Sequence, residues 1–149
     1  MLRIMGWLYI PMIGFVRPRL ISIDEKEALL SIKLRRRTKN HLNSMYFGSL
    51  AVGADVAAGL HAFYFSDELG VKPSFAFKSM NAVFLKRPMG TVFFSSSEGE
   101  KVKHTVLKSI QTGERQNEMI HVEARTADSE LVATFEMEIS IKISGKAKM

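Results

Sequence analysis

Alternation of apolar and polar side chains dominates the C-terminal third of the chain. Between Glu130 and Ile143 every second residue is apolar, and the residues in between are mostly polar or charged. A period of two is typical of a strand that is covered on one face. The stretch Glu118 to Ala127 alternates in the same way, and the short polar segment 127–130 suits the turn of a hairpin. These two stretches are therefore expected to pair antiparallel.

Two more pairs of strands are predicted earlier in the chain, from apolar segments on either side of polar or Pro/Gly turns. They are residues 20–23 with 29–36 around the turn 24–26, and residues 75–85 with 91–96 around the turn 88–90. Between the last two pairs, apolar residues recur every four positions at Val102, Val106 and Ile110. With Gly113 as a stop, this spacing predicts a short surface helix near residues 98–112.

The first eighteen residues form an apolar stretch with one early arginine, so a signal peptide has to be considered. Pro11 interrupts this stretch, and no pair of small residues suited to cleavage precedes Arg17. A short leading helix that packs on the body of the protein is expected instead. Its apolar surface would come from Trp7, Leu8, Ile10, Ile13 and Phe15.

A second apolar segment, Met45 to Phe65, is about long enough to cross a membrane. Asp55 near its middle would cost roughly 2.5–3.5 kcal/mol on insertion, and His61 adds to that cost. The segment is therefore predicted to be a buried helix of a globular protein, capped by Asn43 or Ser44. Its many Gly, Ala and Ser residues keep the helix thin, so that a curved sheet can approach it closely.

The predicted order of elements indicates an α+β fold, in which an antiparallel curved sheet wraps around one long central helix. A short N-terminal helix and the helix inserted near residues 98–112 complete it. The chain has 149 residues, of which 46% are hydrophobic and 24% are charged, and it contains no linker or repeat. These features favour a single domain over residues 1–149.

Composition excludes several classes of chemistry. The chain holds no cysteine, which excludes thiol catalysis, disulfides and cysteine-based zinc sites, and favours a cytoplasmic location. It contains no phosphate-binding loop, dinucleotide fingerprint or serine nucleophile motif, and no histidine has partners at metal-ligand spacing, so we expect no metal and no cofactor.

The net charge of +6 favours an acidic partner. The basic run Arg35–Arg37 lacks interleaved aromatic residues, so we do not expect nucleic acid to be that partner.

Asp55 is the first candidate for a functional residue, because it is the only acidic residue between Arg37 and Asp67. A carboxylate among Val, Gly and Ala side chains is unfavourable unless it is hydrogen-bonded or faces a wet cleft. Two interpretations therefore remain: a buried Asp that ties the helix to a neighbouring loop, or a carboxyl group that acts in a cleft. His61 lies six residues further on, which disfavours an acid–base dyad, and His41 is expected to face solvent.

Around Asp55 the chain resembles the hotdog-fold acyl-CoA thioesterases, in particular the phenylacetic-acid-degradation type and related, less characterised thioesterases. In that type an Asn is followed after five residues by His-Gly-Gly, and an Asp of the central helix comes fifteen positions after the Asn. This chain has Asn40, then Tyr46-Phe47-Gly48 at the His-Gly-Gly position, and then Asp55. The segment Phe84 to Pro88 is similar to a Phe-Leu-Arg-Pro segment of the family, with one additional residue. The resemblance covers Arg17 to Ile143.

The resemblance implies hydrolysis of an acyl thioester by carboxylate-assisted attack of water. It assigns Asp55 as general base or attacking carboxylate, and the backbone N–H of Gly48 as the donor to the thioester carbonyl. A helix N-terminus suits that donor, because its N–H groups are unpaired and the helix dipole is positive there. Asn40 and Tyr46 would orient substrate or water, although a loop-closing amide and a core aromatic ring are equally good interpretations.

Tyr46 and Phe47 depart from the family pattern, because they replace its His and its first Gly. Phe47 is expected to narrow the site, and the role of the His in positioning the thioester is either taken over by the Tyr46 hydroxyl or lost. Coenzyme A is expected as part of the substrate rather than as a cofactor. Its phosphates would need cations, for which Lys86 and Arg87, or the basic run 35–39, are the candidates.

The family implies a homodimer or a dimer of dimers, in which sheets join edge to edge and the active sites lie between protomers. Long strands rich in Val, Ile and Phe independently favour such edge pairing. The main alternative is a non-catalytic hotdog module that binds acyl chains or a protein partner. A further alternative is a peripheral membrane protein held by residues 1–19, whereas no integral membrane protein is expected.

Overall fold

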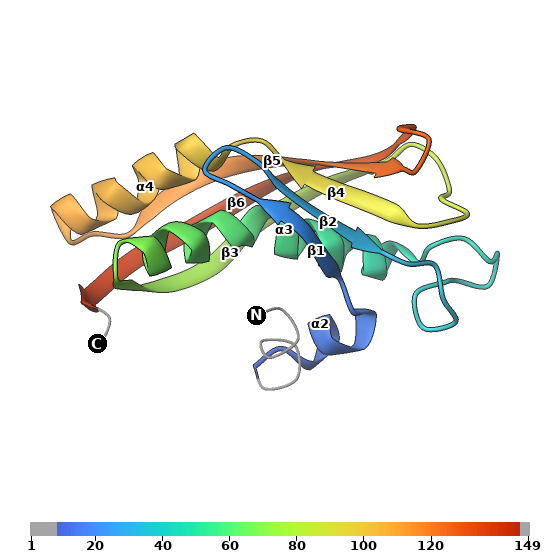
Figure 1. Cartoon of the computed structure of the whole chain (residues 1–149), viewed down its shortest axis with the longest axis horizontal. Coiled ribbons are helices and arrows are strands. Elements are labelled where there is room, and N and C mark those ends of the chain that lie inside the picture. The colour runs from blue at the N-terminus through green and yellow to red at the C-terminus, as the bar shows by residue number, and fades with distance from the viewer. Residues whose placement is uncertain (1–8, 147–149) are drawn as a thin grey trace.

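A six-stranded antiparallel sheet forms one layer of the protein, and one long helix runs alongside it (Figure 1). The computed structural model describes residues 9–146. In chain order the elements are α2 (Pro11–Val16), β1 (Arg19–Ile23), β2 (Ala28–Ile32), α3 (Phe47–Glu68), β3 (Val71–Phe84), β4 (Val92–Ser96), α4 (Gly99–Thr112), β5 (Gln116–Thr126) and β6 (Leu131–Lys146). The strand order is β1-β2-β4-β5-β6-β3, so β1 and β3 form the two edges.

Two of the three predicted strand pairs are confirmed. β1 pairs with β2, and β5 pairs with β6, both antiparallel. On β6 the alternating apolar residues from Ala133 to Ile143 are buried, as the period of two predicts. The register of the β5–β6 hairpin places Ile120 opposite Met137 and Val122 opposite Phe135, so the apolar residues of both strands share one face.

The third predicted pair is wrong, because β3 and β4 do not pair with each other. β3 lies at the sheet edge against β6, whereas β4 lies between β2 and β5. Strand length explains this arrangement: the 14 residues of β3 match the 16 residues of β6, and β4 and β2 have five residues each. Residues 85–91 are therefore a crossing between two parts of the sheet rather than a hairpin turn.

Small residues on α3 allow side chains of the sheet to pack closely against the helix. Gly53 lies against the ring of Phe94 on β4, and Gly59 lies against the ring of Phe75 on β3. Most of α3 is therefore buried, as the sequence predicts for a central helix. No helix within residues 9–146 is long and apolar enough to span a membrane.

The start of α3 differs from the prediction. Its N-cap is Tyr46, whose backbone is extended and whose side chain makes no capping hydrogen bond. The expectation that Asn43 or Ser44 caps the helix is wrong. Ser44 is buried and bonds to Asn40 within the preceding loop, and Asn43 has a left-handed backbone with φ of 62°.

The predicted inserted helix is confirmed as α4. It ends at Gly113, whose φ of 70° is the left-handed conformation that favours glycine at a helix C-terminus. Val102 and Val106 are fully buried where α4 packs against β5, β6 and α3. Ile110, the third member of the predicted apolar row, is 42% exposed, because eight residues carry it about 80° around the helix from Val102, and Ser109 takes the buried position instead.

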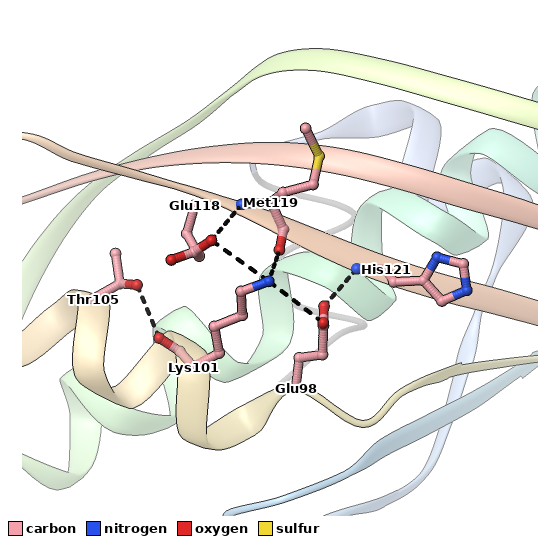
Figure 2. Close-up of polar contacts among 6 residues, drawn as sticks. All are labelled: Glu98, Lys101, Thr105, Glu118, Met119 and His121. Atoms are coloured by element: carbon pink, nitrogen blue, oxygen red, sulfur yellow. Dashed lines mark hydrogen bonds and ion pairs between the residues drawn. The ribbon is translucent and has the colours of Figure 1, made fainter.

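Polar contacts hold the first turns of α4 to β5 (Figure 2). The Nζ of Lys101 donates a hydrogen bond to the backbone oxygen of Met119 at 2.7 Å, and it lies 3.5 Å from a carboxylate oxygen of both Glu98 and Glu118. The other carboxylate oxygen of Glu98 accepts a hydrogen bond from the backbone N–H of His121. These contacts fix the helix on the sheet and give the cluster a structural role.

The leading helix α2 packs on α3, on the side away from the sheet (Figure 1). Ile13 is buried there, as predicted. Ile10 and Phe15 are 41% and 57% exposed, so the expectation that they also pack on the body is wrong. The physical reason is that α2 has only six residues and offers one narrow stripe to α3. Trp7 and Leu8, which belong to the same prediction, lie outside the described residues.

Candidate active site

A stripe of partly exposed residues runs along the first half of α3, and Asp55 is its charged member. The stripe consists of Gly48, Ala51, Val52 and Asp55. Gly59 lies one turn beyond Asp55 on the same face, and a Cβ at Gly59 would contact the ring of Phe75 on β3. Closer to the start of the helix, the ring of Phe47 lies 6.2 Å from that of Phe84 at the other end of β3. Asp55 therefore faces the edge strand β3.

The carboxyl group of Asp55 lacks a polar partner among the residues that the structure describes. Within residues 9–146 no hydrogen bond or ion pair reaches it, and its neighbours on the stripe are Gly, Ala and Val. Burial alone raises the pKa of this carboxyl group above its ordinary value of 3.8. No hydrogen bond in residues 9–146 ties Asp55 to a loop, which argues against the first of the two interpretations. A role of this half-buried carboxyl group in a cleft stays a prediction.

Apolar side chains of β3 are exposed on the face that it turns to α3. Met80 pairs with Met137 of β6 and Phe84 pairs with Ala133, so these β3 residues share the helix-facing side of the sheet. Met80 and Phe84 are nevertheless 42% and 47% exposed, because β3 is an edge strand that reaches past the helix. We call the resulting surface the open face; it consists of Gly48, Ala51, Val52, Asp55, Met80 and Phe84.

The N-terminus of α3 offers the backbone donor that the resemblance assigns. Gly48 is the second residue of the helix, and its N–H donates to no acceptor among the described residues. The ring of Tyr46 lies against Gly48, and it is 4.9 Å from the ring of Phe47. Both rings are about half exposed. The free donor thus lies at the surface beside two exposed aromatic rings.

Gly48 and Asp55 lie on one face of α3 but two turns apart. Seven residues at the rise of an α-helix span about 10.5 Å along its axis. A reacting carbonyl carbon has to lie within about 3–4 Å of the attacking group, and its oxygen within hydrogen-bond distance of the donor. One protomer therefore does not bring Asp55 and the Gly48 N–H to the same substrate carbonyl.

Asn40, the first residue of the resembling motif, is engaged within its own loop. Its Oδ1 accepts hydrogen bonds from the backbone N–H groups of Leu42 at 2.9 Å and Ser44 at 3.2 Å. Its Nδ2 donates to the Ser44 hydroxyl at 2.9 Å. The geometry matches the loop-closing interpretation: the side-chain oxygen and one N–H of the amide are used within the loop, and one N–H stays free.

The two predicted phosphate-binding cations follow the end of β3. Lys86 forms an ion pair with Glu130 at 3.2 Å, whereas Arg87 is exposed and forms no ion pair among the described residues. The carbonyl of the next residue, Pro88, accepts a hydrogen bond from the N–H of Met45 at 2.9 Å. This bond holds the loop after β3 next to the start of α3, so Arg87 belongs to the same end of the molecule as the Gly48 donor.

Sequence reasoning places the histidines correctly but misses four residues of the open face, Ala51, Val52, Met80 and Phe84. His61 is fully buried and its Nε2 bonds to the backbone oxygen of Asp24 at 3.0 Å, which rules out a dyad with Asp55. The apolar stretch 75–85 predicts a strand, but it does not reveal that this strand lies at an edge and exposes Met80 and Phe84. The small residues of α3 do not reveal which side of the helix is exposed.

Comparison with known proteins gives both a family and a fold. The family model described as "Domain of unknown function (DUF4442)" matches residues 2–141. No curated protein matches the chain. A candidate thioesterase from Shewanella oneidensis superposes with a TM-score of 0.80 and 16% identity over 95% of this chain and 94% of its own.

Two further solved structures are similar. A protein of unknown function from Chlorobaculum tepidum has a TM-score of 0.81 and 13% identity, over 95% of this chain and 91% of its own. A thioesterase from Haemophilus influenzae has a TM-score of 0.66 and 12% identity, over 87% of this chain and 81% of its own. At these identities the likeness shows the fold, and the predicted hotdog fold is confirmed.

Proposed function

Since this chain belongs to the family described as a domain of unknown function, DUF4442, and has the hotdog fold, we propose that it is an acyl-CoA thioesterase. It hydrolyses an acyl thioester by attack of a water molecule that Asp55 assists, and it works as a cytoplasmic homodimer. Coenzyme A enters as part of the substrate, and no cofactor takes part. Two of the similar structures bear the name thioesterase, which supports this class of reaction.

The unpartnered carboxyl group of Asp55 is the observation that carries the proposal. A half-buried carboxylate without a hydrogen bond destabilises the folded protein, and no polar partner within residues 9–146 offsets that cost. Such groups cluster at functional sites, where a raised pKa makes a carboxylate a stronger base. The apolar residues around Asp55 on the open face suit an acyl chain.

In the proposed reaction the Asp55 carboxylate accepts a proton from water while the water oxygen adds to the thioester carbon. The carbonyl oxygen gains negative charge, which the Gly48 N–H stabilises at the positive end of α3. Collapse of the tetrahedral intermediate breaks the C–S bond. The departing sulfur takes up the proton, and the products are a free carboxylic acid and coenzyme A. Direct attack by the carboxylate would use the same residues and form an anhydride that water then hydrolyses.

The separation of Asp55 and Gly48 supports a site shared between two protomers. Among the strands of residues 9–146 none pairs with the outer edge of β3, and an exposed edge of 14 residues favours pairing with another strand. Antiparallel pairing of β3 with the same strand of a second copy joins the two sheets and sets the two α3 helices in opposite directions. Gly48 of one copy can then approach Asp55 of the other.

The substrate follows from the groups around this shared site. The acyl chain packs on Met80, Val52 and Phe84, which are apolar and accessible. Arg87 binds a phosphate of coenzyme A, since its guanidinium group is free of carboxylates in the described residues. Lys86 contributes less, because Glu130 already holds its ammonium group.

One observation favours the second candidate function, a non-catalytic module that binds acyl chains. Tyr46 and Phe47 occupy the positions where the resembled family has His and Gly, and their rings lie 4.9 Å apart beside the Gly48 donor. Aromatic rings in that position add apolar contact area for a chain. They also narrow the approach of a thioester carbonyl to the donor.

Release of thiol from a panel of acyl-CoA substrates tests the proposal. Asp55→Asn is expected to lower kcat/KM by at least about 100-fold, the lower range for loss of a general base. Asp67→Asn is the matched control, because it removes an exposed carboxylate near the end of the same helix and is expected to keep full activity. Equal rates for wild type and Asp55→Asn would refute catalysis by Asp55. Binding of acyl-CoA by the wild type without any thiol release would establish the non-catalytic module.

A further inference from the structure

The excess of positive over negative charge lies in the first third of the chain. Residues 1–54 hold nine Lys and Arg and only three Asp and Glu, whereas residues 55–149 hold twelve of each. The three acidic residues of the first part lie close together in the turn between β1 and β2, at Asp24, Glu25 and Glu27. The whole net charge of +6 therefore belongs to the segment that contains α2 and the loop between β2 and α3.

In the structure α2 and this loop meet. A cavity of about 570 Å³ is lined by Phe15 of α2 and by Arg35–Arg37 of the loop. Arg17 and Arg19 follow α2 directly, and both are exposed. No ion pair engages any of these five arginines among the residues that the structure describes. The cavity is thus bordered by unneutralised positive charge.

The outer side of α2 is apolar as well. Met12 and Phe15, which lie on one side of the short helix, are 60% and 57% exposed, and Tyr9 just before the helix is 77% exposed. Ile13 and Val16 on the other side are buried against the body of the protein. We call the exposed side chains of Tyr9, Met12 and Phe15, with the arginines 17, 19 and 35–37, the α2 face.

We infer that the α2 face docks on a lipid bilayer that contains anionic phospholipids. Apolar side chains next to arginines match such a surface, because the arginines bind lipid phosphates while the apolar side chains enter the boundary of the acyl region. The chain before α2 has the same character in sequence, since residues 1–8 contain Trp7 and one Arg but no acidic residue.

Other occupants fit this face less well. A free anionic ligand would use the arginines but not the apolar side chains outside the cavity. A second copy docked by two-fold symmetry on the same face would set its arginines against identical arginines without a carboxylate between them. A bilayer meets both the charge and the apolar area at once, and it leaves the edge of β3 free for the proposed dimer.

Co-sedimentation with vesicles tests this inference without any measurement of catalysis. The protein is mixed with phosphatidylcholine vesicles that contain or lack about one third phosphatidylglycerol, a typical anionic lipid. Binding is expected only to the anionic vesicles, and it is expected to weaken as salt is added. Arg35→Gln/Arg36→Gln should lower the partition coefficient roughly 25-fold, since each arginine near such a surface contributes about fivefold. Met12→Ser/Phe15→Ser should lower it by at least about tenfold.

A charge-matched control separates docking from a general effect of net charge. Lys108→Gln/Lys142→Gln removes two exposed charges from α4 and β6 and is expected to sediment like the wild type. Far-UV circular dichroism and the Tm of each variant check that it is folded.

Four results would overturn the inference. The first is that the wild type does not bind anionic vesicles at low salt, and the second is that the Lys108/Lys142 control loses as much vesicle binding as the Arg35/Arg36 variant. The third is that the Met12/Phe15 variant binds vesicles as well as the wild type does. The fourth is that the Met12/Phe15 variant changes its oligomeric state in the absence of lipid. The last result would assign the face to a contact between copies.

Discussion

Replacing Gly53 by alanine is expected to destabilise the protein, although alanine is the better helix former. A Cβ at this position would lie 2.5 Å from Cε1 and Cε2 of Phe94 and would also clash with its Cζ. Carbon atoms pack at about 3.5–4 Å, so the ring has to retreat by about 1 Å. Phe94 is fully buried between α3 and the sheet, so a shift of its ring displaces the side chains that pack around it.

The size of the loss follows from two opposing effects. Alanine gains about 1 kcal/mol over glycine inside a helix. Overpacking of a core costs about 1–3 kcal/mol, and a clash with three atoms of an immobile ring belongs at the upper end of that range. The net loss is therefore about 2 kcal/mol, or a decrease in Tm of about 4–8 °C for a domain of this size.

Gly59→Ala is the matched comparison on the same helix. Its Cβ would lie 3.4 Å from Cε1 of Phe75, which is ordinary van der Waals contact. The gain in helix propensity is then not cancelled, and the free energy of unfolding should rise by about 0.5–1 kcal/mol. The two Gly→Ala changes are therefore expected to shift the free energy of unfolding in opposite directions. This is expected only if the sheet approaches the helix more closely at Gly53 than at Gly59.

Equilibrium unfolding in urea at one fixed protein concentration measures both changes, and thermal scans by circular dichroism check the order of Tm values. Adding Phe94→Leu to Gly53→Ala should recover part of the loss, because the smaller side chain makes room for the methyl group. A Gly53→Ala variant as stable as the wild type, or the same sign for both glycines, would refute the close packing of β4 on α3.

Three further predictions concern buried polar groups. Burial lowers the pKa of His61 below 6.5, so the unfolded state binds more protons than the folded state at acidic pH. The free energy of unfolding should therefore fall as the pH drops below about 6.5. His61→Gln should flatten that part of a profile of stability against pH. Burial raises the pKa of Asp55, so Asp55→Asn should increase the free energy of unfolding at neutral pH by about 0.5–2 kcal/mol, and a lower Tm in this variant would count against an unpartnered carboxylate. The buried Ser109 hydroxyl donates to the backbone oxygen of Glu114 and accepts from the N–H of Ile143, so Ser109→Ala should cost about 1–3 kcal/mol in urea unfolding, and a loss within error of zero would contradict this.

Parts of the fold could be predicted because the signal is local. The β5–β6 hairpin follows from two alternating stretches with a short polar turn between them, and α4 follows from its apolar spacing and Gly113. The partner of β3 could not be predicted, because alternation defines which face of a strand is buried but not which strand lies next to it. For the same reason, the sequence does not predict that Met80 and Phe84 are exposed, because their exposure depends on the position of β3 at the edge of the sheet.

The candidate site shows the same division. A lone carboxylate in a run of small apolar residues identifies Asp55 from the sequence, but its lack of any partner depends on what packs around it. The amide of Asn40 has equivalent functional and structural interpretations until its loop is seen to use its side-chain oxygen and nitrogen. For α2, the sequence shows which residues are apolar but not which of them are buried. A helix of six residues can bury only one side, so apolar residues on its other side stay exposed.

Mixing two inactive variants tests most directly whether Asp55 and Gly48 of different protomers build one thioesterase site. Asp55→Asn removes the carboxylate, and Gly48→Pro removes the N–H donor in the first turn of α3, where the helix itself makes no use of that N–H. The ring of Tyr46, which a Cβ at this position would meet, is about half exposed and has to turn aside, so far-UV circular dichroism and the Tm check that the variant is folded. Each variant alone should release no thiol above background. After subunit exchange, half of the dimers are mixed and carry one intact site of two, so activity should return to about one quarter of the wild-type rate. Background activity in a mixture whose subunits have demonstrably exchanged, beside an active wild type, would contradict the shared site.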